Sequence, residues 1–491
     1  MTTDTAPQPS NTAAPDRLRT RILRAGGWAT AGFALDKIIA AVQLVVLTRL
    51  LTPADFGLMV ASAAILLALL TLGEMGIESA LVSRQEVRDD DLSVAWTLSL
   101  LRAAALAACL WLGAGLAADA MRMPELAALL RVHALALLIQ GAQSPALALL
   151  LRNLDLGRRV RLDLARRVAE AACTIGLAMW LRSVWALLLG QLAGFLVGSL
   201  LSYAMAPWRP RWSLRRESLE TFWRYGRHFN LMTVLMFGVM SGGELIIGRM
   251  LGMTQLGLYQ VAQAIPLLIG VRLTAVVHQV SFPAYSMLQK NHAGLVRTFA
   301  FQMGLTAACV APVMVVLALA APEIVTVLFG PPWAGTAEPF RALCLYAACA
   351  GFSGVMAAVH YGVNRPDIQA RVWMVQFAVY AAAIVPAILH GGLTGAAWVL
   401  SASYLAGFLI QIGWTAKLLG DTTQVVSPAL RQAVAVVALI GVLLGVLWVL
   451  PGAHLSPGVS TLGWAVGAVL YALYVRYVAY RRLRALWAPA A

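Results

Sequence analysis

Charge is scarce in this sequence. Only 12% of its 491 residues are charged and 60% are hydrophobic, whereas a soluble domain is about half apolar and about a quarter charged. A water-soluble fold of this size could not bury so much apolar surface, so a soluble protein is excluded and lipid must cover much of the chain. The apolar runs are long and continuous rather than alternating, which favours membrane-spanning helices over a barrel.

Paired cysteines and a phosphate-loop lysine are also missing. The five cysteines lie in apolar runs and form no CxxC pair, so a disulfide framework or a zinc site is not expected. The chain has only three lysines, Lys37, Lys290 and Lys417, and none of them follows a glycine. The Gly-Lys pair of a phosphate loop is therefore absent. We expect no metal, no cofactor and no ATP bound by this chain.

The apolar runs predict an all-α integral membrane protein with about fourteen transmembrane helices. Their approximate ranges are 26–48, 56–78, 93–117, 126–150, 164–181, 184–206, 229–251, 256–281, 298–320, 337–362, 371–389, 392–414, 432–450 and 458–479. The run at 164–181 is the weakest, because Arg166, Arg167 and Glu170 lie in its first half.

Basic residues are distributed unevenly between the two sides of this arrangement. The formal net charge is +15, which in a soluble protein would suggest a nucleic-acid partner. Here Arg and Lys crowd alternate loops, at 152–167 and 207–228 above all, and both ends of the chain. Because cytoplasmic loops of membrane proteins carry the excess of Lys and Arg, the pattern predicts cytoplasmic termini and no nucleic-acid partner.

An internal repeat divides the chain. Residues 48–65 read TRLLTPADFGLMVASAAI, and residues 248–265 read GRMLGMTQLGLYQVAQAI, at an ungapped offset of 200. Parallel repeats form two halves related by an axis along the membrane normal. We therefore predict two pseudo-symmetric six-helix bundles around a central cavity, with two further C-terminal helices. The predicted parts are a tail 1–25, a bundle 26–206, a linker 207–228, a bundle 229–414, a loop 415–431, a helix pair 432–480 and a tail 481–491.

Ionisable residues inside the predicted helices are the candidates for a functional site, because such residues are costly in lipid and usually face a cavity or a partner. Most lie in helices 1, 2, 7 and 8, which the repeat relates. The charged candidates are Asp36, Lys37, Glu74, Glu78, Arg102, Glu244 and Arg272.

Each candidate has two interpretations. Arg272 and Lys37 could hold an anionic headgroup, or they could form structural ion pairs. Glu74, Glu78 and Glu244 could carry protons or a coupling ion, although capping at a helix end is favoured for Glu78. Asp36 could share that coupling role or neutralise Lys37. Gln260 and Gln263 could bond sugar hydroxyls or join neighbouring helices.

No catalytic set stands out in the sequence. An enzyme that polymerises or ligates lipid-linked sugars would be expected to use sizeable external loops. The longest predicted external loop, 321–337, is short and lightly charged. Two related halves around a cavity favour an alternating-access transporter instead. A membrane enzyme acting on lipid-linked glycans stays open as a less favoured alternative, and a scaffold as a remote one.

Several motifs resemble one family of transporters. RLLTPADFGLMVAS resembles the link between the first two helices of polysaccharide and O-antigen (Wzx-type) flippases, in the multidrug/oligosaccharidyl-lipid/polysaccharide exporter superfamily. The similarity covers most of residues 26–380, and it is closest to the subfamily of colanic-acid and teichuronic-acid exporters. It also includes LGEMGIESALVSRQEV, FWRYGRHFNLM, ELIIGRMLGMTQLGLYQVAQAI, VSFPAYSMLQK and PFRALCLYAACAGFSGVMAAVHYGVNRPDIQARV.

The resemblance implies a flippase of the bacterial cytoplasmic membrane that moves an undecaprenyl-pyrophosphate-linked oligosaccharide outward for surface polysaccharide synthesis. Its partners would be membrane lipid and the polysaccharide polymerase with its chain-length machinery. Arg272 and Lys37 then become headgroup candidates, with Arg102 behind them. One departure matters: the family often has Asn-x-x-Asp where this chain has Ser241-Gly242-Gly243-Glu244, so a role of that Asn does not carry over. A drug or cation antiporter of the same superfamily is the alternative.

Overall fold

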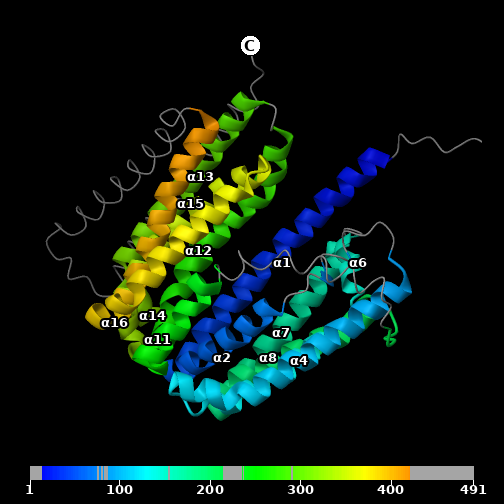
Figure 1. Cartoon of the computed structure of the whole chain (residues 1–491), viewed down its shortest axis with the longest axis vertical. Coiled ribbons are helices and arrows are strands. Elements are labelled where there is room, and N and C mark those ends of the chain that lie inside the picture. Colours follow the sequence, from blue (N-terminus) through cyan, green and yellow to red (C-terminus); the bar gives the residue numbers. More distant parts are fainter. Residues whose placement is uncertain are drawn as a thin grey trace, which may run out of the picture. The chain divides into compact units, whose positions relative to one another are not determined.

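The computed structural model describes residues 14–73, 77–78, 81, 87–152, 155–213, 235, 237–288 and 291–420. All regular elements in these ranges are helices, and seven are long and apolar enough to cross a membrane. The chain divides into two compact units (Figure 1): a first unit of residues 1–51 and 65–230, and a second unit of residues 52–64 and 231–491. An all-α, multi-pass membrane protein is thereby confirmed. The predicted helices 432–450 and 458–479 lie outside the described residues, so the count of fourteen stays a prediction.

The first unit is a bundle of long helices. Within it α7 packs along α8, α4 along α5, and α1 along α7. Its helices are α1 (Ala14–Leu50), the end of α2 (Pro53–Leu72), α4 (Asp89–Met121), α5 (Leu126–Gly141), α6 (Leu147–Arg152), α7 (Leu156–Leu181) and α8 (Val184–Met205).

The weakest predicted span is a complete helix in the structure. α7 begins at Leu156, well before the predicted residue 164, and its N-cap Asp155 accepts a hydrogen bond from the Arg158 backbone N–H at 3.3 Å. Arg159 and Asp163 form an ion pair one turn apart at 3.2 Å. Such i,i+4 pairs offset charge on a helix surface. Of the charges that weakened the prediction, Arg166 and Arg167 lie 3.8 and 2.8 Å from the Glu170 carboxylate on the same helix.

The predicted span 126–150 is not one helix, which corrects the sequence interpretation. α5 ends at Gly141, and the short α6 starts at Leu147. Pro145 lies between them and has no backbone N–H to donate. The preceding Ser144 N–H donates instead to Ser202 Oγ of α8, at 3.0 Å. The break therefore arises from one proline and is stabilised by a neighbouring helix.

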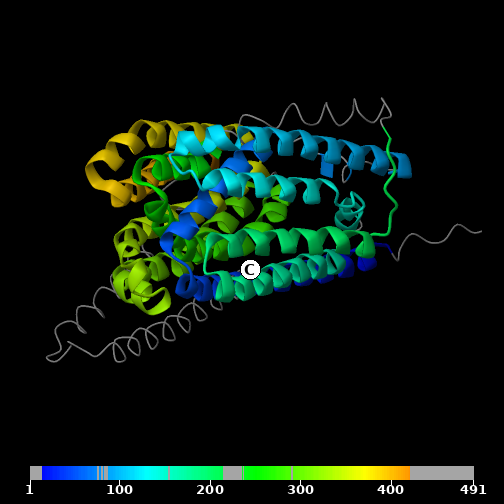
Figure 2. The same ribbon diagram turned by 90° about the horizontal axis from the view of Figure 1, so that it is seen from below.

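The second unit contains the start of α2 together with later helices. α12 packs along α15, which also contacts α13 and α16 (Figures 1 and 2). The other elements are a π-helical turn η2 (Gly238–Gly242), α11 (Gly243–Leu251), α12 (Met253–Met287), α13 (His292–Leu319), α14 (Ala321–Leu328), η3 (Pro331–Thr336), α15 (Ala337–Gly362) and α16 (Pro366–Leu419).

The element α16 contains both of the predicted spans, 371–389 and 392–414, as two helices joined at a kink. Gly392 has φ 55° and ψ −137° inside it, a backbone conformation outside the helical region that suits glycine. Beyond this point the two arms lie side by side, since Gln411 Nε2 donates to Gln369 Oε1 at 3.1 Å. The two predicted spans are therefore the two arms of a helical hairpin.

The two copies of the internal repeat meet within the second unit. Gly57 of α2 and Gly257 of α12 are equivalent repeat positions, and the two backbones cross there. A Cβ on Gly57 would clash with the Met253 carbonyl oxygen, and a Cβ on Gly257 would clash with the Pro53 carbonyl oxygen. The contact is reciprocal, as a two-fold relation between the copies requires. Only glycine allows the backbones to approach so closely.

Candidate functional site

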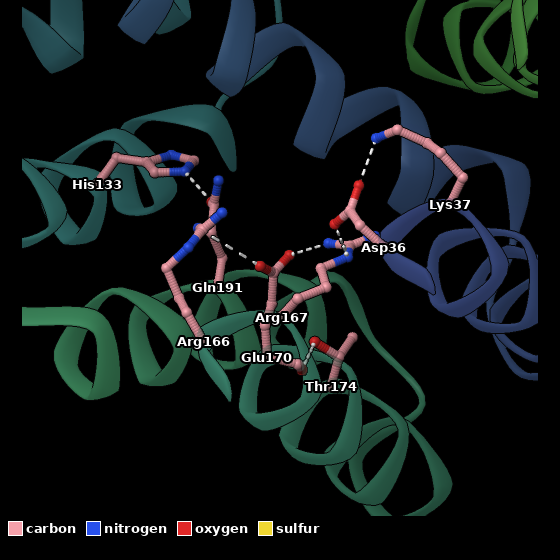
Figure 3. Close-up of polar contacts among 8 residues, drawn as sticks. All are labelled: Asp36, Lys37, His133, Arg166, Arg167, Glu170, Thr174 and Gln191. Atoms are coloured by element: carbon pink, nitrogen blue, oxygen red, sulfur yellow. Dashed lines mark hydrogen bonds and ion pairs between the residues drawn. The ribbon is translucent and has the colours of Figure 1, made fainter. Parts of the chain in front are cut away.

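A cluster of charges joins α1 to α7 in the first unit (Figure 3). Asp36 of α1 lies 3.6 Å from Arg167 of α7, measured from Oδ1 to Nε. Arg167 in turn donates to Glu170 Oε1 at 2.8 Å, and Arg166 lies 3.8 Å from the same carboxylate. We call these four residues and Lys37 the charged cluster. It holds three cations and two carboxylates, so its formal charge is one positive unit.

Lys37 belongs to the charged cluster through its neighbour in sequence. Its Nζ donates to Asp36 Oδ2 at 2.5 Å and lies 5.5 Å from the centre of the Phe33 ring. Adjacent helical positions point about 100° apart, but the long lysine side chain bends back to reach the carboxylate. Of the two interpretations of Lys37, the structure shows the ion pair with Asp36.

Glycines of α8 make room for these charged side chains. A Cβ on Gly194 would lie 2.8 Å from Glu170 Cβ, and a Cβ on Gly198 would lie 2.9 Å from Arg166 Cδ. The Arg166 guanidinium also lies over the Phe195 ring at 5.7 Å. The stems of the charged residues therefore pack against a helix surface without bulk, as small residues permit in membrane bundles.

A polar cavity of about 240 Å³ opens in the same unit. Two predicted site residues line it: Arg102, which donates to the Gly73 carbonyl oxygen at 3.1 Å, and Glu78, whose carboxylate is 3.6 Å from Arg159 Nη1. The complete lining is Ile77, Glu78, Leu81, Ser99, Arg102, Gln140, Gln143, Ser144, Pro145, Leu147, Ala148 and Arg159. We call this the polar cavity.

Glu244 is the centre of a polar chain in the second unit. The Gln263 amide donates to Glu244 Oε1 at 3.0 Å and to Gln260 Oε1 at 2.7 Å. The phenol groups of Tyr259, Tyr346 and Tyr380 lie close enough to this carboxylate to interact with it electrostatically. Three predicted site residues thus lie together, and α11 is joined to α12 through them. A carboxylate among hydroxyl and amide groups can bind a cation, a proton or sugar hydroxyls.

The remaining predicted site residues are not placed by the structure. Arg272 lies on the backbone of α12, but its side chain is outside the described part of the molecule, and Glu74 is outside it altogether. His133 and His360 each form a hydrogen bond through Nε2, to Gln191 and to Thr415, both at 2.9 Å. In the described ranges no group of His, Cys, Asp and Glu is arranged to hold a metal ion.

Sequence reasoning missed four charged residues of these sites. Arg159, Arg166, Arg167 and Glu170 were counted as loop charges or as a weakness of the span 164–181. The same observation contained the signal that could have found them, because ionisable residues within a membrane helix indicate a functional site by default. Hydropathy penalises such residues, so it does not identify them.

Known structures with this arrangement of helices are transporters. A structure titled lipid II flippase MurJ, in an inward closed conformation, superposes with a TM-score of 0.76 at 13% identity, covering 92% of this chain and 99% of that one. An inward-facing MATE-family multidrug resistance transporter of the MOP superfamily superposes with a TM-score of 0.63 at 15% identity, covering 79% and 96%. The chain therefore shares the fold of these two structures.

The family follows from the sequence match. The model of the family described as polysaccharide biosynthesis protein matches residues 46–338, more than half of the chain. The chain belongs to this family.

Curated relatives agree with the family. The Escherichia coli K12 lipopolysaccharide biosynthesis protein WzxC is 21% identical over 401 residues, which is 80% of this chain and 79% of that one. The succinoglycan biosynthesis transport protein ExoT of Rhizobium meliloti is 24% identical, over 60% and 59%. The teichuronic acid biosynthesis protein TuaB of Bacillus subtilis is 21% identical, over 69% and 70%.

Proposed function

We propose that this chain is a flippase that moves a polyprenyl-pyrophosphate-linked oligosaccharide across the cytoplasmic membrane by alternating access. The observation that carries the proposal is the joint match: a family of polysaccharide biosynthesis proteins over residues 46–338, on the fold of a lipid II flippase. Relatives named for lipopolysaccharide, succinoglycan and teichuronic acid make products that differ in sugar. The shared substrate feature would be the lipid carrier.

The charges retained inside membrane helices support a substrate with an anionic part. The charged cluster carries a net positive charge, and Arg102 lines the polar cavity of the same unit. Guanidinium groups bind phosphate oxygens in a bidentate manner. We assign the pyrophosphate to Arg272, Lys37 and Arg102, with Lys37 leaving Asp36 when the headgroup arrives. Gln260 and Gln263 would contact sugar hydroxyls, and Glu244 would couple an ion.

We place both termini in the cytoplasm of a bacterial cell, on the alternation of basic loops. The oligosaccharide would be delivered to the outer leaflet, where a polymerase and its chain-length machinery would use it. Undecaprenyl pyrophosphate is the carrier expected for this chemistry.

The test is the leaflet position of the lipid-linked repeat unit in a deletion strain. Without this protein, we expect the repeat unit to accumulate on the cytoplasmic side, where an external glycan-modifying probe cannot reach it. Restoring the gene should restore access. Normal translocation in a strain that also lacks any redundant exporter would overturn the proposal.

A cation or drug antiporter is the second candidate, because the chain shares its fold with MATE transporters and has Glu244 bonded in a polar site. Carboxylates in a transport cavity attract cations. On this alternative, deletion would sensitise cells to cationic compounds and leave surface polysaccharide intact. The same strain therefore separates the two functions.

A further inference from the structure

The polar cavity lies at one end of the first unit. Its lining comes from the residues that follow α2, from α4, from the end of α5 and the break after it, and from the first turn of α7. The basic loops that follow helices 2 and 4 are the ones assigned to the cytoplasm by their charge. The cavity therefore lies at the cytoplasmic end of one unit, whereas the expected transport cavity lies between two halves.

We propose that this cavity is a docking site for a phosphoryl anion, held by Arg102 and Arg159 before translocation begins. The site shares Arg102 with the headgroup candidates named above and adds Arg159, which has no part in that assignment. Its assignment to the lipid-linked substrate rests on the proposed function. The phosphate chemistry itself rests on the lining residues alone.

The charges of the cavity suit an anion that is exchanged. Arg102, Arg159 and Glu78 are the charged residues of the lining, and Asp163 pairs with Arg159 at 3.2 Å from outside it. Glu78 is 57% exposed and its oxygen lies 3.6 Å from Arg159 Nη1. That separation is longer than a hydrogen bond, and exposed pairs of this kind are weak. A phosphate can therefore displace Glu78 from Arg159 at small cost.

Arg159 is held ready for a ligand by a second partner. Its Nε donates to Asp163 Oδ2 at 3.2 Å, one turn along α7. This bond fixes the stem of the side chain and leaves the Nη1 end directed at Glu78. Arg102 is similarly anchored by the Gly73 carbonyl oxygen, at 3.1 Å from Nη1. Two pre-positioned guanidinium groups suit the several oxygens of a phosphate.

Neutral donors complete the lining. Gln140, Gln143 and Ser99 contribute amide and hydroxyl groups. Ser144 is only 2% exposed, and its hydroxyl has no hydrogen-bond partner within the described residues. A buried hydroxyl without a partner costs free energy, which a bound phosphate oxygen would recover. A cavity of about 240 Å³ can hold a diphosphate together with ordered water, since one water occupies about 30 Å³ in the liquid.

The experiment measures binding of inorganic pyrophosphate to the purified full chain in detergent, by titration calorimetry. We expect Arg159→Ala and Arg102→Ala each to weaken binding about tenfold, as loss of a charge-assisted hydrogen bond implies. Glu78→Gln should strengthen binding, because the competing carboxylate is gone. Arg158→Ala is the matched control: Arg158 adjoins Arg159 on α7, pairs with Asp155 and does not line the cavity.

The outcomes separate the possibilities. Equal binding by the wild type and both arginine variants, with unchanged melting temperatures, would overturn the site, and so would a loss in Arg158→Ala as large as in Arg159→Ala. Misfolding of an arginine variant could also abolish binding, but it could not produce the tighter binding expected for Glu78→Gln. If polyprenyl diphosphate in nanodiscs displaces the bound pyrophosphate, the natural ligand is a lipid headgroup. If it does not displace the pyrophosphate, a lipid source is overturned. The leaflet assay tests export independently, so either proposal can fail alone.

Discussion

Single residues of the described membrane helices show how this chain tolerates charge in lipid. Asp36 pairs with both Lys37 and Arg167 across two helices, while Glu244 accepts a hydrogen bond from the Gln263 amide. A lone charge in the bilayer is expensive, and pairing reduces that expense. The same residues were candidates for substrate binding, so pairing in this state and exchange during transport are compatible roles.

Gly57→Ala should destabilise the protein by about 1–3 kcal/mol, the usual cost of overpacking. The added methyl group would clash with the Met253 carbonyl oxygen at the crossing of the two repeat copies, so the helices must separate. The measurement is the midpoint of unfolding of the purified protein in detergent. Gly113→Ala is the control, because a Cβ there meets nothing within 4 Å, and it should leave the midpoint unchanged or raise it. Equal midpoints for the two variants would contradict the crossing.

Glu244→Ala should cost about 1–3 kcal/mol, because it leaves the buried amide of Gln263 without one of its acceptors. Glu244→Gln keeps an acceptor oxygen and should retain most of the stability. Thermal unfolding of both variants measures the difference. If export is lost in Glu244→Gln at a normal unfolding midpoint, the carboxylate charge acts in coupling. If export is normal, the coupling role assigned to Glu244 is wrong.

At the scale of elements, charge decides how α7 is built. Hydropathy alone places this helix at 164–181, whereas the structure starts it at Leu156. The first turns are basic and carry ion pairs along the helix and to α1. α7 therefore belongs to the bundle although its first turns are charged, because its charges have partners on α7 itself and on α1. Hydropathy does not take such partners into account.

Arg167→Ala should loosen the contact between α1 and α7. It leaves Asp36 and Glu170 without the guanidinium that lies between them, and removal of one partner from such a half-buried network costs about 1–3 kcal/mol. The unfolding midpoint in detergent should fall accordingly. Arg161→Ala on the same helix is the control, since Arg161 is exposed and bonds the Gly157 carbonyl oxygen of its own helix. If Arg161→Ala lowered the midpoint as much as Arg167→Ala does, a specific link between α1 and α7 through Arg167 would be contradicted.

Gly392→Ala should destabilise the helical hairpin by about 1–2 kcal/mol. Gly392 has φ 55°, and a side chain raises the energy of left-handed backbone by that amount. Gly391→Ala is the neighbouring control, because a Cβ there meets nothing within 4 Å and its φ is not positive. Unfolding of both variants in detergent provides the comparison. A smaller loss in Gly392→Ala than in Gly391→Ala would show that the turn does not depend on this backbone conformation.

At the scale of the whole molecule, a segment of one half is built into the other. Residues 52–64 of α2 belong to the second unit, although residues before and after them belong to the first. Thr52 begins this segment: its backbone N–H and its hydroxyl both donate to Asp55 Oδ2, at 3.0 and 2.6 Å. Phe56 then packs edge-on to the buried Trp333, with ring centres 5.1 Å apart. The repeat thus has a structural role where its two copies meet.

The orientation of the chain in the membrane can be tested by labelling single cysteines. In a cysteine-free background, Arg158→Cys should be protected from a membrane-impermeant maleimide in intact cells, and Arg182→Cys should be labelled. Arg158 lies in the first turn of α7 and Arg182 follows the other end of this helix, so we expect the two on opposite sides of the membrane. Disruption of the cells should make both positions reactive. The reverse pattern in intact cells would invert the topology.

Much of the fold was predictable because the bilayer imposes a simple rule. Apolar runs of about 20 residues must be helices, and runs such as 184–206 and 337–362 agree closely with α8 and α15. The break before Leu147 could be read from Pro145, but its stabilisation could not, because it depends on Ser202 of a distant helix accepting the Ser144 N–H. The site was half predictable: the residue types were found, but their partners were not.

The sequence by itself determined that this chain is a helical membrane protein with a repeat and a few costly charges inside its helices. Those properties follow from composition and periodicity, which act locally along the chain. Only the tertiary structure decided that Lys37 pairs with Asp36, that Arg167 links α1 to α7, and that Glu78 and Arg102 share a cavity. Side-chain partnership depends on which helices pack together and at what height, and no local pattern encodes either.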